Sequence, residues 1–183
     1  MYYAIVDVKK ESIGITWRFS KNKPLIEKIF LPCRRNQLIA RIKRECSATG
    51  MTERNVPGNI AERIAGLYAG SKVNFDYSLL NLAKLTEFSA KVLKQTSKIP
   101  RGEIATYSGL AQKIGSPKAA RAVGTALAKN PFPLIIPCHR VVRADGSPGG
   151  YGGGIMMKKE LLAKEGVVLD EKGRVAVKCF SPD

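Results

Sequence analysis

Prolines and glycines divide the second half of this 183-residue chain into short segments. Proline cannot continue a helix, and glycine favours the position just after its C-terminal end. Apolar residues recur at helical spacing between these interruptions, which predicts helices over residues 85–97, 107–114, 117–128 and 156–164. Gly115 and Gly166 are the expected stops, and Ser116-Pro117 is the expected start of the third helix. The tight turn at Gly115 makes the second and third helices a helix-turn-helix pattern.

The first third of the chain has the pattern of β-strands. Runs of β-branched and aromatic residues over 2–8, 13–19 and 25–31 are separated by short polar breaks, which predicts an antiparallel meander. Two amphipathic stretches follow, over 36–45 and 59–68.

We therefore expect an α+β fold in two domains and a tail. Residues 1–80 would form an N-terminal antiparallel β-sheet with helices, an RNase H-like or ferredoxin-like scaffold. Residues 84–169 would form a C-terminal helical, winged-helix-like domain that contains the helix-turn-helix. Residues 170–183 have the composition of a tail, in which 175–177 is a candidate strand.

The chain is strongly basic. It has 31 Lys and Arg residues against 15 Asp and Glu, a net charge of +16 that is spread over both halves. Such a field favours a polyanionic partner, most simply nucleic acid, through counterion release. A solubilising surface, or adaptation to an unusual environment, is the alternative that charge leaves open.

The four cysteines are expected to be reduced thiols. The N-terminus lacks the basic start and apolar core of a signal peptide, and no apolar run reaches the roughly 20 residues that a membrane span requires. A cytoplasmic protein with free cysteines follows. No C-x-x-C pair is present and there is one histidine, so we expect no structural metal, and we interpret Cys33, Cys46 and Cys179 as small buried apolar residues.

The remaining cysteine, Cys138, lies in the run Ile135-Ile136-Pro137-Cys138-His139-Arg140-Val141-Val142, which contains the chain's only histidine. Positive neighbours lower the pKa of a thiol, so this run predicts a nucleophile at the mouth of a pocket. Adjacent residues in an extended segment point in opposite directions. We therefore expect His139 to act on the sulfur through a water molecule. A cysteine hydrolase, which needs a histidine remote in sequence, is not favoured.

The second helix of the helix-turn-helix is made of small residues. Its sequence, residues 117–127, offers Arg121 and few of the polar side chains with which ordinary proteins distinguish bases in the major groove. Small side chains allow the backbone to approach DNA closely, which predicts weak sequence preference. An alanine-rich core helix is the structural alternative for this segment.

Several segments together resemble one family, the O6-alkylguanine-DNA alkyltransferases, also called methylated-DNA–protein-cysteine methyltransferases. The resemblance covers residues 85–167, and the first 80 residues share only length and strand-rich character with the family. It rests on residues 101–107, 117–124, 130–131, 136–142 and 161–166 and on the glycine loop, residues 146–154, which contains Tyr151.

The resemblance implies a direct-reversal DNA repair reaction. Cys138 would attack the alkyl carbon on guanine O6, and the substrates would include O4-alkylthymine; the sulfur would keep the alkyl group irreversibly. His139, oriented by Glu165, would take the thiol proton through water, and Tyr107 would donate a proton or hydrogen bond to the guanine.

The resemblance also implies how DNA is handled. Arg121 would fill the gap left by a flipped nucleotide, in a minor-groove approach. The other expected DNA contacts are Tyr107, Lys118, Ala120, Ala122 and Thr125, and the expected pocket residues are Asn130, Pro133, Val141, Tyr151 and Gly152. The partner would be double-stranded DNA containing O6-alkylguanine, bound by a monomer without cofactor or membrane, in the cytoplasm at the nucleoid or in a eukaryotic nucleus.

One position departs from many members of the family. Gly152 stands where they carry a side-chain hydroxyl, which leaves a backbone amide to contact O6 and predicts a roomier pocket that accepts groups larger than methyl. The main rival function is a helix-turn-helix regulator or lesion-marking protein without enzyme activity. Such proteins need no thiol in the pocket, so Cys138 argues against them, and the length leaves no room for a fused activator domain.

Overall fold

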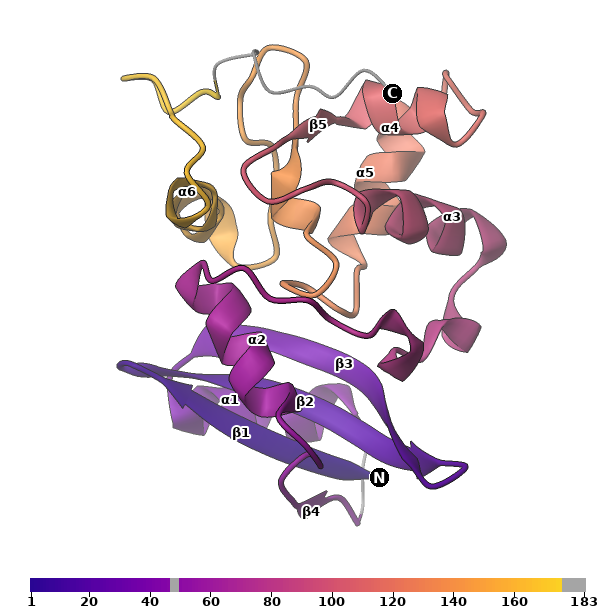
Figure 1. Cartoon of the computed structure of the whole chain (residues 1–183), viewed down its shortest axis with the longest axis vertical. Helices are drawn as coiled ribbons and strands as arrows, with labels where there is room; N and C mark the ends of the chain where they lie inside the picture. Colours follow the sequence, from indigo (N-terminus) through magenta and orange to yellow (C-terminus); the bar gives the residue numbers. More distant parts are fainter. Residues whose placement is uncertain (47–49, 176–183) are drawn as a thin grey trace.

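The computed structural model describes residues 1–46 and 50–175, and its first part is a four-stranded sheet (Figure 1). Strands β1 (Tyr2–Val8), β2 (Glu11–Ser20) and β3 (Lys23–Cys33) form the predicted antiparallel meander. The two-residue strand β4 (Thr52–Glu53) adds to β1 in parallel, so that the order is β3-β2-β1-β4. The sequence did not predict β4, because it is short, polar and exposed.

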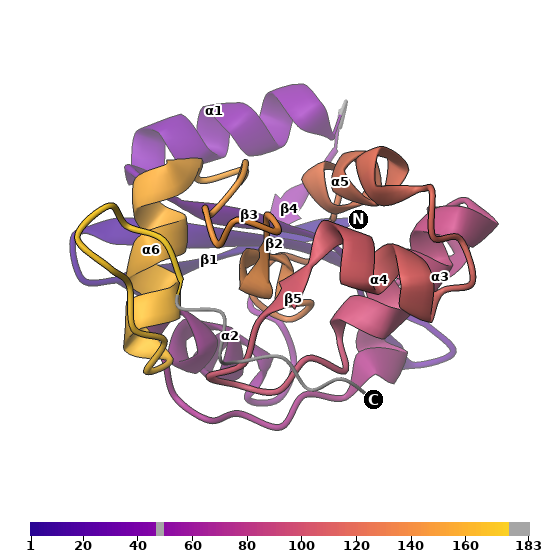
Figure 2. The same ribbon diagram turned by 90° about the horizontal axis from the view of Figure 1, so that it is seen from above.

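Helices α1 (Arg35–Glu45) and α2 (Ile60–Ala69) lie on opposite faces of this sheet (Figures 1 and 2). Strand β2 supplies both faces by alternation: Ile13, Ile15 and Trp17 belong to the main core with α2, while Gly14 points to α1. A Cβ on Gly14 would stand 2.9 Å from Cδ1 of Ile42, so only glycine allows α1 to pack this closely. The sheet is therefore covered on both sides.

The second part of the chain is mostly helical. The predicted helices are observed as α3 (Glu87–Thr96), α4 (Tyr107–Lys113), α5 (Ala120–Ala128) and α6 (Gly154–Lys164). Short 3₁₀ turns occur at Tyr77–Leu79, Leu82–Lys84 and Cys138–Arg140 (η3). Strands β5 (Ala105–Thr106) and β6 (Val141–Val142) pair in parallel and connect the start of α4 to the segment after Cys138.

The turn between α4 and α5 confirms one expectation and corrects another. Gly115 has φ +72°, its N–H bonds to the Gln112 carbonyl, and the N–H of Ser116 bonds to the Ala111 carbonyl, which is the Schellman ending that glycine favours. The prediction that Ser116 caps α5 is wrong. The backbone N–H of Ser116 completes the end of α4, the Ala119 N–H donates to the Ser116 carbonyl in a separate turn, and α5 begins at Ala120, without a side-chain cap.

The two parts meet along the edge strand β3. The Ile29 N–H donates to the Pro131 carbonyl at 2.8 Å, which places the segment between α5 and Cys138 against the sheet edge. One buried cluster continues from Ile15 and Trp17 of β2 to Val123 and Leu127 of α5. Val175 forms an isolated bridge with Leu169, and the rest of the candidate strand at 175–177 lies outside the described residues. None of the described helices is long and apolar enough to cross a membrane.

Candidate active site

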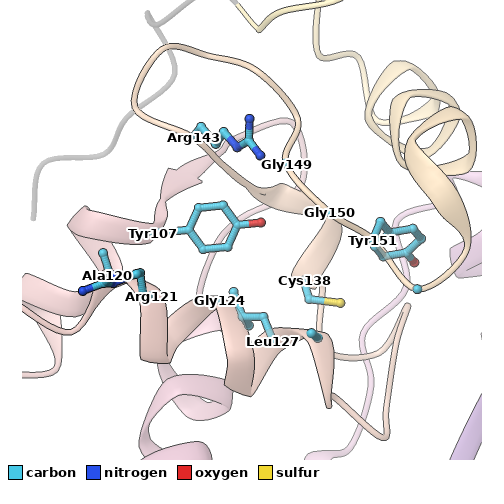
Figure 3. Close-up of a pocket in the computed structure, with 12 residues that line it drawn as sticks. Tyr107, Ala120, Arg121, Gly124, Leu127, Cys138, Arg143, Gly149, Gly150 and Tyr151 are labelled. Atoms are coloured by element: carbon cyan, nitrogen blue, oxygen red, sulfur yellow. The ribbon is translucent and has the colours of Figure 1, made fainter.

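Cys138 opens the 3₁₀ turn η3 at the wall of a cavity of about 540 Å³. The side chain is 8% exposed, and its sulfur points toward Tyr151 (Figure 3). Residues of α4, α5 and the glycine loop complete the lining, with Tyr107, Arg121 and Arg143 on the side away from the sheet. A nucleophile here is shielded from bulk water but can be reached from the face that carries α5.

Asn130 fixes the cysteine from the end of α5. Its side-chain N–H₂ lies 3.1 Å from the Ile136 carbonyl and 3.2 Å from Sγ of Cys138, while its Oδ1 accepts from the Phe132 N–H at 2.9 Å. One amide thus connects the turn after α5 to the segment that carries the thiol. An amide donor also stabilises a thiolate at this position.

His139 and Glu165 form a buried pair behind the cysteine. Nε2 of His139 lies 3.0 Å from Oε1 of Glu165, and the two side chains are 2% and 7% exposed. Arg140 holds the same carboxylate with Nε at 2.7 Å and Nη2 at 2.8 Å, and its Nη1 donates to the Ile99 carbonyl. Glu165 can serve both partners because it is the C-cap residue of α6, which stops at Gly166 as predicted.

The pKa values assign the proton within this pair. Burial raises the pKa of Glu165, but the hydrogen bonds from His139 and Arg140 outweigh it and bring the pKa to about 2. Burial lowers the pKa of His139 despite the carboxylate beside it. At neutral pH the carboxylate is therefore ionised and the imidazole neutral, so Nε2 carries the proton and Nδ1 is a free acceptor. Nδ1 has no hydrogen-bond partner among the described residues.

The structure corrects the expected pKa of the thiol. Burial raises the pKa of Cys138, and the opposing effects of Asn130 and Lys158 do not outweigh it. The basic neighbour Arg140, which suggested a lowered pKa, is neutralised by Glu165 and does not act on the sulfur. The resting side chain is thus a protonated thiol, and a base is required to activate it.

Lys158 is a functional candidate that our sequence analysis missed. It is fully buried in α6, and its Nζ donates to the Val141 carbonyl at 2.6 Å and lies 3.5 Å from the Gly150 carbonyl. Burial lowers its pKa to about 8, with the Cys138 thiolate acting in the opposite direction. A signal was present in the sequence: Lys158 precedes Leu161 and Leu162 by three and four residues, so it lies on the buried face of the helix.

Tyr107 lies at the start of α4 with its hydroxyl turned into the cavity (Figure 3). The Thr106 side chain caps this helix by accepting from the Gly109 N–H at 2.9 Å, which places Tyr107 in its first turn. Gly149, at φ +70°, lies against the tyrosine: a Cβ there would stand 2.8 Å from the hydroxyl. Burial raises the pKa of Tyr107, so its hydroxyl is a proton donor at neutral pH.

The expected DNA contacts occupy the outer face of α4 and α5. Arg121 is exposed at the cavity rim and Ala120 lies beside it. Ala122, Thr125 and Lys118 are exposed but do not line this cavity. The Thr125 hydroxyl donates to the Arg121 carbonyl at 3.2 Å, so it is engaged with its own helix.

The expected pocket residues are divided between two cavities. Tyr151 and Gly152 line both the large cavity and a smaller one of about 150 Å³ beside the sheet, and Asn130 and Pro133 line the smaller one. Val141 is buried, and its carbonyl accepts the bond from Lys158 described above rather than being free for a guanine edge. Among the described residues, 1–46 and 50–175, no three His, Cys, Asp or Glu side chains lie close enough together to hold a metal ion.

Comparisons with known proteins agree on one family. The model for the 6-O-methylguanine DNA methyltransferase DNA-binding domain matches residues 87–167. A methylated-DNA–protein-cysteine methyltransferase of Mycolicibacterium paratuberculosis is 42% identical over 66% of this chain and 73% of its own length. The chain belongs to this family. A relative of that name from Methanothermobacter thermautotrophicus is 51% identical, over 55% of this chain and only 56% of its own length.

Solved structures extend the alkyltransferase likeness to the N-terminal part. The crystal structure of Mycobacterium tuberculosis OGT in complex with DNA has a TM-score of 0.73 at 31% identity, over 90% of this chain and 92% of that one. The O6-methylguanine-DNA methyltransferase of Pyrococcus kodakaraensis has a TM-score of 0.69 at 28% identity, over 90% and 99%. The α+β arrangement of sheet and helical domain is therefore the fold of the family.

Proposed function

We propose that this alkyltransferase-family protein repairs DNA by moving an alkyl group from guanine O6 to Sγ of Cys138. The single observation that carries the proposal is the position of that sulfur. It lies at the inner wall of a cavity bounded by Arg121 and Tyr107 of the helix-turn-helix, with the His139–Glu165 pair behind it. A basic chain with net charge +16 supplies the attraction to DNA, so we expect binding to weaken steeply with salt.

Activation of the thiol begins at Nδ1 of His139. This nitrogen is the free acceptor of a neutral imidazole whose tautomer is set by Glu165. A water molecule between Nδ1 and the sulfur would carry the thiol proton to the ring, and the ionised Glu165 stabilises the imidazolium that results. Asn130 and Lys158 support the thiolate that is formed.

The transfer itself is an in-line displacement. The thiolate electron pair forms the S–C bond, the C–O6 bond breaks, and its pair stays with the guanine in the DNA, which takes a proton from Tyr107. The proton that His139 took from the thiol then returns to Tyr107 through solvent, so that the thiol proton ends on the guanine. The thioether product has no acidic proton and no leaving tendency, so each molecule reacts once. O4-alkylthymine presents the same exocyclic oxygen chemistry and is expected to react also.

The burial of the thiol supports a mechanism in which the base leaves the duplex. Cys138 is buried, so a stacked guanine would not reach it, and the nucleotide would flip into the cavity. Arg121, exposed on α5 beside small residues, is placed to occupy the gap, and Tyr107 lies next to the entering nucleotide. We propose residues 84–169 as the DNA-binding and alkyl-transfer domain, acting as a monomer on double-stranded DNA in the compartment that holds the DNA.

Gly152 carries no side chain at the wall shared by the two cavities, and a Cβ there would be 3.6 Å from Leu31 with no closer neighbour. This supports acceptance of alkyl groups larger than methyl.

One experiment tests the proposed function. The protein is incubated with a duplex oligonucleotide containing O6-methylguanine, and the protein mass gain is located by peptide mass spectrometry. We expect one methyl group on Cys138 and none in the Cys138→Ala variant. Turnover beyond one equivalent would show a true catalyst and refute the single-turnover reaction. Specific binding of the lesion without methyl transfer would show a lesion-marking protein.

A further inference from the structure

Cys138 lies between two cavities, and the smaller one has a different character from the one that faces α5. Both contain Cys138, Tyr151, Gly152 and the end of α5 in their walls. The smaller cavity, of about 150 Å³, is closed on its other side by the edge strand β3 and by α1. It is large enough for a few non-hydrogen atoms and a water molecule, but too small for a guanine.

The wall of this second cavity is basic. Lys28 of β3, Arg41 of α1 and Lys129 after α5 all line it, and no Asp or Glu of the described residues does. Glu45 lies behind Lys28 and Arg41 and bonds to both, with N–O distances of 2.7 and 2.8 Å. One carboxylate between two cations leaves the wall with a net positive charge.

The cations are held in place at this wall. Lys28 and Arg41 both lie over the ring of Phe30, at 5.1 and 5.5 Å from its centroid, and their side chains are 38% and 39% exposed. The basic wall is thus ordered by Phe30 and Glu45, yet its charges remain partly accessible to a small anion.

The displacement geometry directs part of the substrate toward this wall. The guanine enters from the α5 side, and attack requires sulfur, alkyl carbon and O6 in a line. Any substituent on that carbon must then project sideways from the line. The base fills the α5 side, and the second cavity shares Cys138, Tyr151 and Gly152 with the first, so the substituent would point past these residues toward the second cavity.

We propose that the second cavity is a subsite for adducts whose far end is a carboxylate, of which O6-carboxymethylguanine is the simplest. The inference rests on the proposed function and adds a substrate class to it. The sulfur pair attacks the CH₂ carbon, the C–O6 bond breaks with its electron pair staying on the guanine, and the proton lost by the thiol neutralises the guanine, so that Cys138 becomes S-carboxymethylcysteine with its carboxylate facing Lys28 and Arg41. No further reactant is needed.

The test compares two substrates of nearly equal shape. Duplexes that differ only in O6-carboxymethylguanine or the neutral O6-carbamoylmethylguanine are reacted with the protein, and the transfer rates are expressed as a ratio, acid to amide. We expect the ratio to fall about fivefold in the Lys28→Gln/Arg41→Gln double variant, as for two partly solvated charges. In Glu45→Gln the ratio should rise, because the neutralising carboxylate is gone.

Lys43→Gln is the matched control: it removes an exposed cation from the same helix, away from the cavity, and should leave the ratio unchanged. A ratio that is equal in wild type and double variant would overturn the inference. So would an equal loss with acid, amide and O6-methylguanine, because that result assigns the cations to a DNA phosphate. Absence of methyl transfer in the wild type is a separate outcome, which refutes the proposed function itself.

Discussion

Nε2 of His139 lies 3.0 Å from Oε1 of Glu165, and both side chains are buried. This relationship leaves Nδ1 as the only basic nitrogen of the ring. His139 can therefore act on Cys138 although the two residues are adjacent in sequence, provided that water connects them. Glu165, twenty-six residues later in the sequence, binds Nε2 and so leaves Nδ1 as the nitrogen that can accept the thiol proton.

Replacement of Glu165 tests this pair. Glu165→Gln removes the charge that stabilises the imidazolium, so we expect methyl transfer to slow by about tenfold or more. It also leaves the buried Arg140 unpaired, so the free energy of unfolding should fall by about 3 kcal/mol. Single-turnover rates with saturating DNA and urea unfolding measure the two effects. Glu160→Gln, an exposed position on the same helix, should change neither. An unchanged transfer rate in Glu165→Gln would remove Glu165 from the mechanism.

Stability should decline in acid in two stages. The folded pKa of His139 is lowered, so the unfolded chain takes up this proton first as pH falls below about 6.5. The folded pKa of Glu165 is about 2 against an ordinary 4.5, so its contribution is complete above pH 4.5 and is lost as pH falls toward 2. Unfolding free energies measured from pH 7 to pH 3 should fall throughout, and fall less steeply below pH 4.5 in Glu165→Gln. A curve that rises toward acid contradicts this assignment.

Lys158 should influence the thiol electrostatically. Lys158→Met keeps an unbranched side chain, one atom shorter, but removes the charge and the bond to the Val141 carbonyl, so the pKa of Cys138 should rise further. The rate of alkylation by iodoacetamide, followed against pH, measures that shift. Because the pKa of Lys158 is about 8, the difference from wild type should be largest below pH 8 and vanish well above it. Lys159→Met is the control, and an equal effect there would show a nonspecific loss of charge.

Arg121 should matter for duplex DNA and not for a free base. A nucleobase in solution needs no extrusion from a stack, whereas a duplex does. In Arg121→Ala we expect the activation barrier for transfer from an O6-methylguanine duplex to rise by a few kcal/mol, which slows the reaction roughly a hundredfold. The reaction with free O6-benzylguanine should be nearly unchanged. Equal losses with the two substrates would indicate that Arg121 supports the pocket instead of DNA handling.

The open wall at Gly152 predicts tolerance of bulky groups. Transfer from O6-benzylguanine and O6-methylguanine in the same duplex should proceed at comparable rates, within about tenfold. Gly152→Ser, which adds a side chain at the wall shared by both cavities, should slow benzyl transfer more than methyl transfer. Refusal of the benzyl adduct by the wild-type protein would show that the space beside Gly152 is not used.

Local sequence was sufficient to predict strands β1 to β3 and helices α1 to α6, apart from the start of α5, and it indicated Cys138 as the candidate nucleophile; the two-residue strands β4, β5 and β6 were not predicted. The strand pattern before residue 34 and the glycines at 115 and 166 act over a few residues, through alternation and through a left-handed backbone that glycine adopts without strain. Ser116 shows the limit: a turn over residues 116–119 lies between the two helices, so α5 starts at Ala120 and Ser116 does not cap it. The family resemblance, not spacing, selected Glu165, whereas Arg121 stood out in the sequence as the arginine of a helix of small residues.

Tertiary structure decided the pKa of the Cys138 thiol and which groups surround it. Flanking cations predicted a lowered pKa for Cys138, but Arg140 turns to Glu165 and burial raises that pKa instead. Lys158 reaches the site only because α6 packs its buried face beside Val141. The second cavity exists because the edge of β3 meets the turn after α5, and a contact between segments a hundred residues apart leaves no periodic trace in the sequence. Burial and long-range charge are properties of packing, so only the folded chain sets them.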